Sequence, residues 1–211
     1  MSDSSPGPLD PILRPASEIV AALGTSTEGS LEIGSILEAF GSRAHALAML
    51  VLALPETVPL PLPSASLILG IPLMAIAVHL SLFGEQSVVP GFIRRRRIPA
   101  SAMAGLAKYG VPALRALERI SQPRWRFLAA QTRLAGVFCA WLAFILFLPL
   151  PLANIAPASC ILLISLGLLL RDGLMIALGM MLSAILTAGL GYLGNAILAF
   201  LGSLFSPLTQ Q

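Results

Sequence analysis

The hydrophobic pattern of this chain consists of helix-like apolar runs that prolines interrupt at two places. The first run covers residues 44–54, about 16 Å as an α-helix and so roughly half of a ~30 Å hydrocarbon core. The apolar pattern resumes over 64–83, which is about a spanning length. A proline removes a backbone donor and restrains the residue before it, so the helix is predicted to break between the two runs. The residues of this first break are Pro55, Pro59, Pro61 and Pro63.

The second half of the chain repeats this arrangement. Residues 134–148 form another apolar run, a second break follows, and residues 158–170 resume the pattern. A shift of 94 residues superposes the two proline clusters, with Pro149 on Pro55. Internal repeats with helices broken at membrane depth are typical of transporters, so the sequence predicts two related helical hairpins. The second break contains Pro149, Pro151 and Pro157.

Other segments complete the predicted organisation. Residues 17–23 and 30–40 carry apolar residues at helical spacing and predict short amphipathic helices at the membrane surface. Residues 173–204 would form a helix of about 48 Å, which must tilt, kink or extend beyond a bilayer. We expect a loosely attached tail over 1–29 and a single membrane domain over 30–211. That domain divides into repeat one (44–83), a basic interfacial linker (90–133) and repeat two (134–205).

Composition makes this an all-α integral membrane protein rather than a soluble domain. Hydrophobic residues are 56% of the chain and charged residues only 11%, with a mean hydropathy of +0.88, whereas about a quarter of a soluble domain is charged. Cys139 and Cys160 stand singly in apolar runs without metal-ligand spacing. We therefore expect no disulfide, no metal site and no cofactor.

The basic residues are strongly clustered. Ten of the thirteen lie between residues 94 and 133, where Glu118 is the only acid. Such a block beside apolar segments predicts a cytoplasmic location and a surface for anionic lipids or partner proteins. Nucleic-acid binding is the weaker reading, because interleaved aromatic residues and a soluble fold are missing. The surface is predicted to contain Arg94, Arg95, Arg96, Arg97, Arg115, Arg119, Arg124 and Arg126.

Glu56 is the principal candidate for a functional side chain, because an ionisable group at membrane depth marks a functional site by default. If the first break instead lies at the membrane surface, Glu56 is simply solvated, and both readings stay open. Its shifted counterpart in the second half is Leu150.

Polar residues near the breaks and helix ends are further candidates for cavity or substrate contacts. Serine and asparagine more often cap helix ends than bind substrates. A single histidine near a helix end is more often an interfacial hydrogen bonder than a proton shuttle. His45 and Arg43 are expected to be interfacial anchors, and Arg171 with Asp172 a loop ion pair. The candidates are Ser64, Ser66, His79, Asn154 and Ser159.

No catalytic constellation is evident. The sequence lacks paired carboxylates, a histidine cluster, a nucleophile with an adjacent base, and a phosphate loop, so we do not expect an enzyme. Two topologies remain open for the hairpins. Both hairpins could enter and leave on the cytoplasmic side, which makes them parallel, or each repeat could cross once, which makes them inverted repeats.

Three stretches resemble the ExoD family of bacterial exopolysaccharide synthesis proteins. They are LALPETVPLPLPSASLILGIPLMAIAVHL, PALRALERISQPRW and FLPLPLANIAPASCILLISLGLLLRDG, and the likeness runs from about residue 30 to residue 181. His79 and the Leu152-Ala153-Asn154 triplet depart from the family pattern, which more often has glutamine and Phe-Gly-Asn there. The resemblance implies a multi-pass protein of the bacterial inner membrane that is connected with exopolysaccharide production.

Two main functions fit this sequence. The first is a transport-like or lipid-handling role in exopolysaccharide synthesis or export, with the two breaks facing each other across a central cavity. The second is a membrane scaffold or regulator that binds synthesis proteins or anionic lipids through its basic region. A polar cavity between the breaks would support the first, and a dry, tightly packed centre would contradict it. A membrane enzyme, the third possibility, would need carboxylates or histidines gathered near Glu56.

Overall fold

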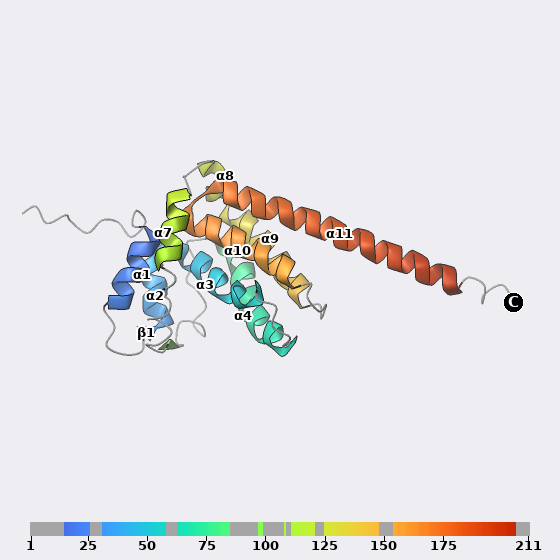
Figure 1. The fold of residues 1–211 in the computed structure, drawn as a ribbon, viewed down its shortest axis with the longest axis horizontal. Helices are drawn as coiled ribbons and strands as arrows, with labels where there is room; N and C mark the ends of the chain where they lie inside the picture. Colours follow the sequence, from blue (N-terminus) through green and yellow to red (C-terminus); the bar gives the residue numbers. More distant parts are fainter. Residues whose placement is uncertain are drawn as a thin grey trace, which may run out of the picture.

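The computed structural model describes residues 15–25, 31–57, 63–84, 97–98, 108, 111–120, 125–147 and 154–205. Its architecture is α-helical, as predicted, and one two-residue antiparallel pair joins β1 (Leu31–Glu32) to β2 (Arg97–Ile98). Figure 1 shows a central group of helices, with short helices at one end and a long helix projecting from the other. The helices are α1 (Ala16–Thr25), α2 (Ile33–Phe40), α3 (Ala44–Ala53), α4 (Pro63–Phe83), α7 (Val111–Ile120), α8 (Arg126–Ala130), α9 (Thr132–Leu146), α10 (Ile155–Leu170) and α11 (Gly173–Phe205).

The structure breaks the helices where the prolines predict. α3 ends at Ala53, a 3-10 turn, η2, covers Pro55–Thr57, and α4 begins at Pro63. In the first turn of a helix a proline costs little, because its missing N–H would have no intrahelical partner. The second hairpin is built the same way, with Pro157 in the first turn of α10. Pro59, Pro61, Pro149 and Pro151 lie outside the described residues.

Helices α4 and α9 run antiparallel and join the two hairpins. Gly136, near the start of α9, packs so closely on the end of α4 that an added Cβ would lie 2.6 Å from the Ser81 nitrogen. Phe147, just after α9, packs instead on Gly70 near the start of α4. The C-terminal end of α4, which is the outer end of the first hairpin away from its break, therefore lies beside the start of α9, where the second hairpin begins.

The outer ends of all four central helices meet at one end of the bundle. His45 in the first turn of α3 contacts His79 near the end of α4. The Arg171 guanidinium, just after α10, donates to the Ser42 hydroxyl, just before α3 (3.4 Å). We call this end the charged end and the opposite end, where both helices break, the break end.

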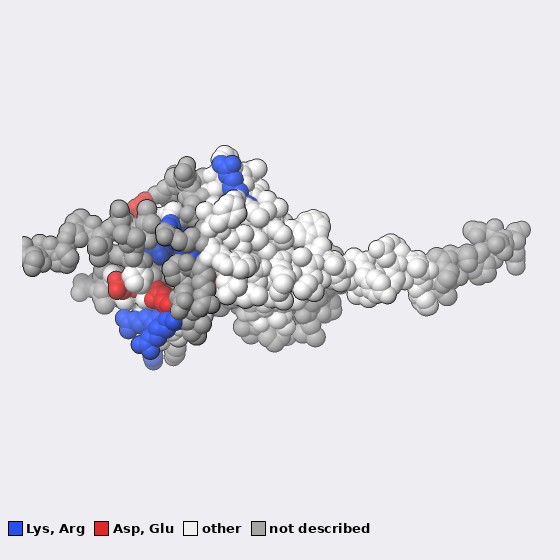
Figure 2. All heavy atoms as spheres, turned by 90° about the horizontal axis from the view of Figure 1, so that it is seen from above, with Lys and Arg blue, Asp and Glu red and all other residues white. Residues whose placement is uncertain are grey.

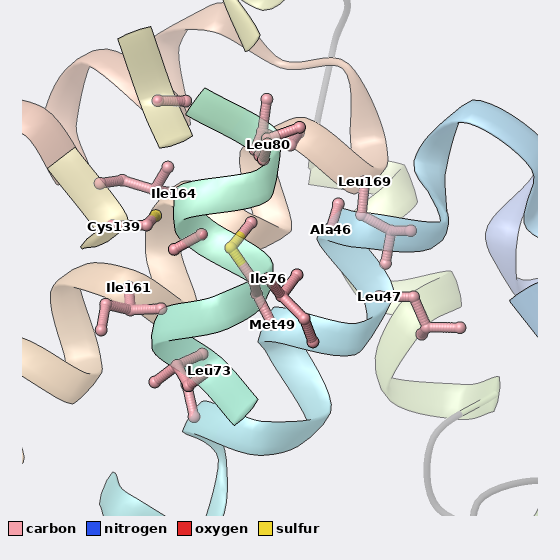
Figure 3. Close-up of a cluster of buried hydrophobic side chains, with 14 of the residues drawn as sticks. Ala46, Leu47, Met49, Leu73, Ile76, Leu80, Cys139, Ile161, Ile164 and Leu169 are labelled. Carbon is pink, nitrogen blue, oxygen red and sulfur yellow. The ribbon is translucent and has the colours of Figure 1, made fainter. Parts of the chain in front are cut away.

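The four central helices form a closed ring with an apolar interior. α3 contacts α4 and α10, and α9 contacts the same two helices. Figure 3 shows the interior, where side chains from three of these helices interdigitate around Met49 of α3. The tight fit makes the ring intolerant of changes in volume. Fully buried residues of this interior include Met49, Leu73, Ile76, Leu142, Ile161 and Ile164.

Helix α11 packs on the ring with its first half only. Gly167 of α10 lies against Ile176, and Gly179 lies against Ile164, so α10 and α11 are antiparallel neighbours. The helix has 33 residues, about 50 Å, and residues 191–200 are all exposed. Within the part of the chain that the structure describes, Gly173–Phe200 is the one helix long and apolar enough to cross a membrane.

Charge is segregated along the molecule. Figure 2 shows the described Lys, Arg, Asp and Glu side chains gathered at the end that holds α1, α2 and α7, and none on the projecting half of α11. Residues 173–205 contain no charged side chain at all. The long axis of the protein therefore leads from a charged end to an apolar one.

Candidate functional site

The first break holds a buried carboxylate. Glu56 lies in η2 and is only 8% exposed, so of the two readings that the sequence leaves open the structure agrees with the buried one. The turn around it is fixed locally, because the Thr57 hydroxyl donates to the Leu54 carbonyl (2.7 Å) and the Thr57 N–H donates to the same oxygen (3.2 Å). These two bonds hold the described part of the break in a tight turn directly after α3.

The first break lies against the second hairpin. η2 contacts α10, and because α10 begins at the break end, the part it meets is the start of that helix. Asn154 precedes this start and is half-buried, and its backbone carbonyl accepts the Ala158 N–H (3.1 Å). Its side chain makes no capping bond to α10. η2, the described part of the first break, therefore lies close to α10, the helix that follows the second break.

The other predicted contact residues are not gathered at this place. Ser159 is exposed and its hydroxyl donates to the Ile155 carbonyl (2.7 Å), a bond within its own helix. His79 lies at the charged end, more than four helical turns, or about 24 Å, beyond the start of α4 at Pro63. Ser64 and Ser66 fall in α4, but their side chains are outside the described residues.

The described interior of the ring is apolar. Leu73 and Ile76 of α4 and Ile161 and Ile164 of α10 belong to one buried cluster, and all four side chains are fully buried. Ser165 of α10 is a buried polar residue among the described ones. The predicted polar cavity has no counterpart among the described residues, while residues 58–62 and 148–153 of the breaks lie outside them.

The chain's two histidines meet at the charged end. His45 Nε2 and His79 Nδ1 are 3.2 Å apart, and the two rings stack with centroids 5.4 Å apart. The expectation that His45 and Arg43 anchor the protein at an interface is wrong, because they are 1% and 6% exposed. Sequence reasoning missed the pair, although an antiparallel hairpin places the outer ends of its two helices together, and each histidine lies near such an end.

Arg171 and Asp172, for which the sequence predicts a loop ion pair, form the turn between α10 and α11, and each contacts another group there. Arg171 adopts a left-handed backbone conformation (φ 55°) and reaches Ser42. The Asp172 carboxylate accepts the Leu174 N–H (3.0 Å), which caps the first turn of α11. The turn is therefore tied to both the first hairpin and the long helix.

The basic region is described only in part. Arg115 and Arg119 are exposed on one face of α7, while Val111 and Leu114 on the other face are buried and the helix packs on α1. Lys108 is also exposed. Arg94, Arg95, Arg96 and Arg124 lie outside the described residues, as do the side chains of Arg97 and Arg126.

The arrangement offers little for metal or redox chemistry. No group of three or more potential metal ligands exists among the described side chains. Cys139 and Cys160 are free, buried thiols inside the ring. What the described residues present is a buried acid at the break end, a buried histidine pair at the charged end, and an exposed basic helix.

Comparisons with known proteins show which family the sequence matches. The family model "Exopolysaccharide synthesis, ExoD" matches residues 16–192. Protein ExoD of Rhizobium meliloti is 28% identical over 193 residues, covering 88% of this chain and 80% of that protein. An uncharacterized protein of Synechocystis is 27% identical over 150 residues, 69% of this chain and 70% of that one. No solved structure matches the chain. Because the family match covers most of its length, the chain belongs to the ExoD family of exopolysaccharide synthesis proteins.

Proposed function

We propose that this protein is an inner-membrane scaffold or regulator of exopolysaccharide synthesis that inserts both hairpins from a cytoplasmic, charged end. Family membership connects it with that process. The observation that carries the orientation is that all four outer helix ends meet beside the charged helices, while the breaks lie away from them. Basic segments next to apolar helices stay in the cytoplasm.

In this proposal the hairpins dip into the membrane and return, and α11 alone crosses it. α10 has 16 residues, about 24 Å, and α11 has 33, about 50 Å. Starting from the same turn, α11 therefore runs well beyond the breaks. Backbone without helical hydrogen bonds is tolerated at membrane depth where protein surrounds it. The packing of η2 on α10 and the burial of Glu56 support such a placement of the first break.

A scaffold accounts for the structure better than a conduit does. Substrate passage through the ring would require a polar path, and the described interior is filled by leucine, isoleucine and methionine side chains. The structure does have an exposed, positively charged surface, which is the basic face of α7 formed by Arg115 and Arg119. We propose that this face binds anionic headgroups of the cytoplasmic leaflet and holds synthesis proteins there.

Lipid handling at the break end is the second candidate, favoured by one observation. Glu56 is an acid kept inside the apolar end of the molecule, against the start of α10. Buried ionisable groups at such depth are costly and are usually retained for a function. In this alternative Glu56 contacts the polar part of a lipid substrate.

Complementation of a deletion strain separates the two candidates. We expect the Arg115→Glu/Arg119→Glu variant to remain in the membrane but to lose most exopolysaccharide production, because the basic face is reversed. Gln131→Glu is the matched control, since Gln131 is exposed and lies outside α7. Glu56→Gln should retain production. Loss with Glu56→Gln and full production with the reversed α7 face would replace the scaffold with lipid handling.

A further inference from the structure

The two histidines form a contact that closes the first hairpin at the charged end. α3 and α4 leave this end for the break and return to it, and between them His45 Nε2 and His79 Nδ1 lie at hydrogen-bonding distance, 3.2 Å. The rings are nearly parallel, with an interplanar angle of 14°, and His79 also contacts Phe83 with centroids 5.0 Å apart. The chain contains no other histidine. The pair therefore has a specific geometry rather than a chance proximity of exposed side chains.

Burial selects one tautomer of the neutral pair. His45 is 1% exposed, and its Nδ1 atom is buried without a hydrogen-bond partner. If His79 donated, His45 would have to carry its own proton on Nδ1, leaving a buried donor unsatisfied. If His45 Nε2–H donates to His79 Nδ1, the buried atom is only a bare lone pair. Unsatisfied N–H groups are rarer and costlier than under-satisfied acceptors, so we assign His45 as the donor.

This tautomer has no good place for an additional proton. A proton on His79 Nδ1 occupies the lone pair that accepts the bond. His79 can then donate to His45 Nε2 only if His45 moves its own proton to the buried Nδ1 atom, where it has no partner. Without that move, two N–H groups face each other and the contact breaks. A proton on His45 Nδ1 keeps the bond but leaves an unpaired cation in a buried ring. Burial, with a smaller contribution from the neighbouring His79, lowers the pKa of His45 to about 4. Of the two rings, His79 is the more exposed, being half-buried.

The surrounding charges do not favour a protonated pair. Neither α3, α4 nor α10 contains any charged residue within its helical span. The nearest cations at the charged end are Arg43, which is buried just before His45, Arg171, which reaches Ser42, and Arg133, which contacts Gly84 after α4. Among the described residues, the acids on the neighbouring elements are Asp172, which caps α11, and Glu38, which is exposed on α2.

We infer that the His45–His79 contact is an acid-sensitive latch, which holds α3 and α4 together at the cytoplasmic end when neutral and releases them when His79 is protonated. Release would loosen the base of the first hairpin while the second hairpin, which α11 supports, stays packed. Cytoplasmic pH would then change the stability of the contact between α3 and α4 at the charged end. This inference goes beyond the proposed function, because it concerns the fold of the hairpin whatever the basic face binds.

Hydrogen exchange of the full-length protein in lipid nanodiscs tests the latch directly. Between about pH 7.5 and pH 5, after correction for intrinsic rates, we expect exchange at residues 44–49 and 79–83 to accelerate about fivefold to tenfold, as expected for loss of one net hydrogen bond. Exchange at residues 164–179, in the α10–α11 hairpin, should not change. Ser81→Ala is the matched control on α4, because it keeps both histidines, and it should show the same acceleration.

His79→Phe keeps a ring beside His45 and Phe83 but cannot be protonated. In this variant acid should no longer accelerate exchange at the outer ends of α3 and α4. Acceleration that persists in His79→Phe, or that is missing in the unmodified protein, would overturn the latch. If the variant does not fold, ¹⁵N-histidine NMR of the unmodified protein decides. His45 Nε2–H should be hydrogen-bonded at neutral pH and lose that bond by about pH 5, and a bond that survives would exclude the inference.

Discussion

The Glu118 carboxylate binds the start of α1 from 101 residues away, accepting the Ser17 backbone N–H (2.9 Å) on one oxygen and the Ser17 hydroxyl (2.5 Å) on the other. Ser17 is the second residue of α1, where backbone N–H groups have no intrahelical partner. A carboxylate at a helix N-terminus satisfies such a donor and complements the helix dipole. Glu118 is also the only acid in the basic region, so a structural role in joining α7 to α1 explains its presence there.

Replacing Glu118 should detach α1 from α7. We expect Glu118→Ala to reduce the free energy of unfolding by about 1–3 kcal/mol, because it leaves charge-assisted bonds unmade and a partly buried donor unsatisfied. Glu118→Gln keeps one acceptor and should lose less. Thermal unfolding in detergent measures both, with Arg115→Ala, at an exposed position of the same helix, as the control. Equal stability of all three variants would contradict the role given to this contact.

Close packing between the two hairpins should make Gly136 intolerant of any side chain. A Cβ at this position would lie 2.6 Å from the Ser81 nitrogen and 2.9 Å from its Cα, so Gly136→Ala must push α4 and α9 apart. We expect a loss of about 1–3 kcal/mol, the usual range for overpacking. Gly191→Ala is the matched control, because nothing lies within 4 Å of its Cβ position. It should be neutral or stabilising, since alanine favours a helix. A control that destabilises as much as Gly136→Ala would contradict the packing.

The contact between α9 and α11 should depend on one hydroxyl. Trp141 Nε1–H donates to the Thr187 hydroxyl (3.0 Å), which itself donates to the Ser183 carbonyl (2.9 Å). Bonds of this kind between membrane helices are worth about 0.6 kcal/mol on average. Thr187→Val should therefore cost about that much and increase the mobility of the Trp141 ring, which tryptophan fluorescence anisotropy reports. Thr187→Ser retains the hydroxyl and should behave like the unmodified protein.

The helix breaks were predictable because proline acts locally. Each proline removes a donor regardless of tertiary context, so α3 ends at Ala53 and α4 begins at Pro63 close to where the pattern places the break. The repeat of the proline clusters likewise indicated two hairpins. The relative direction of the hairpins depends on contacts such as Gly136 with Ser81, which no local pattern contains.

Side-chain environments were harder to predict than helices. Glu56, His45 and Arg43 are charged or polar residues at helix ends, where exposure is the usual outcome, yet packing buries all three. The expected polar cavity rested on the idea that broken helices surround water. The apolar residues on the inner faces of α4 and α10 were visible in the sequence, but hydrophobic runs look alike whether they face lipid or each other.

Cysteine accessibility measures most directly whether both hairpins enter the membrane from one side. Single cysteines at Glu38, Gln131 and Arg171 mark the chain before hairpin one, between the hairpins and after hairpin two, and all three side chains are exposed. Ser203, near the end of α11, marks the opposite side. With Cys139 and Cys160 replaced by alanine, we predict that a membrane-impermeant maleimide labels the first three only from the cytoplasmic face and position 203 only from the periplasmic face. Labelling of positions 38 and 131 from opposite faces would contradict the account.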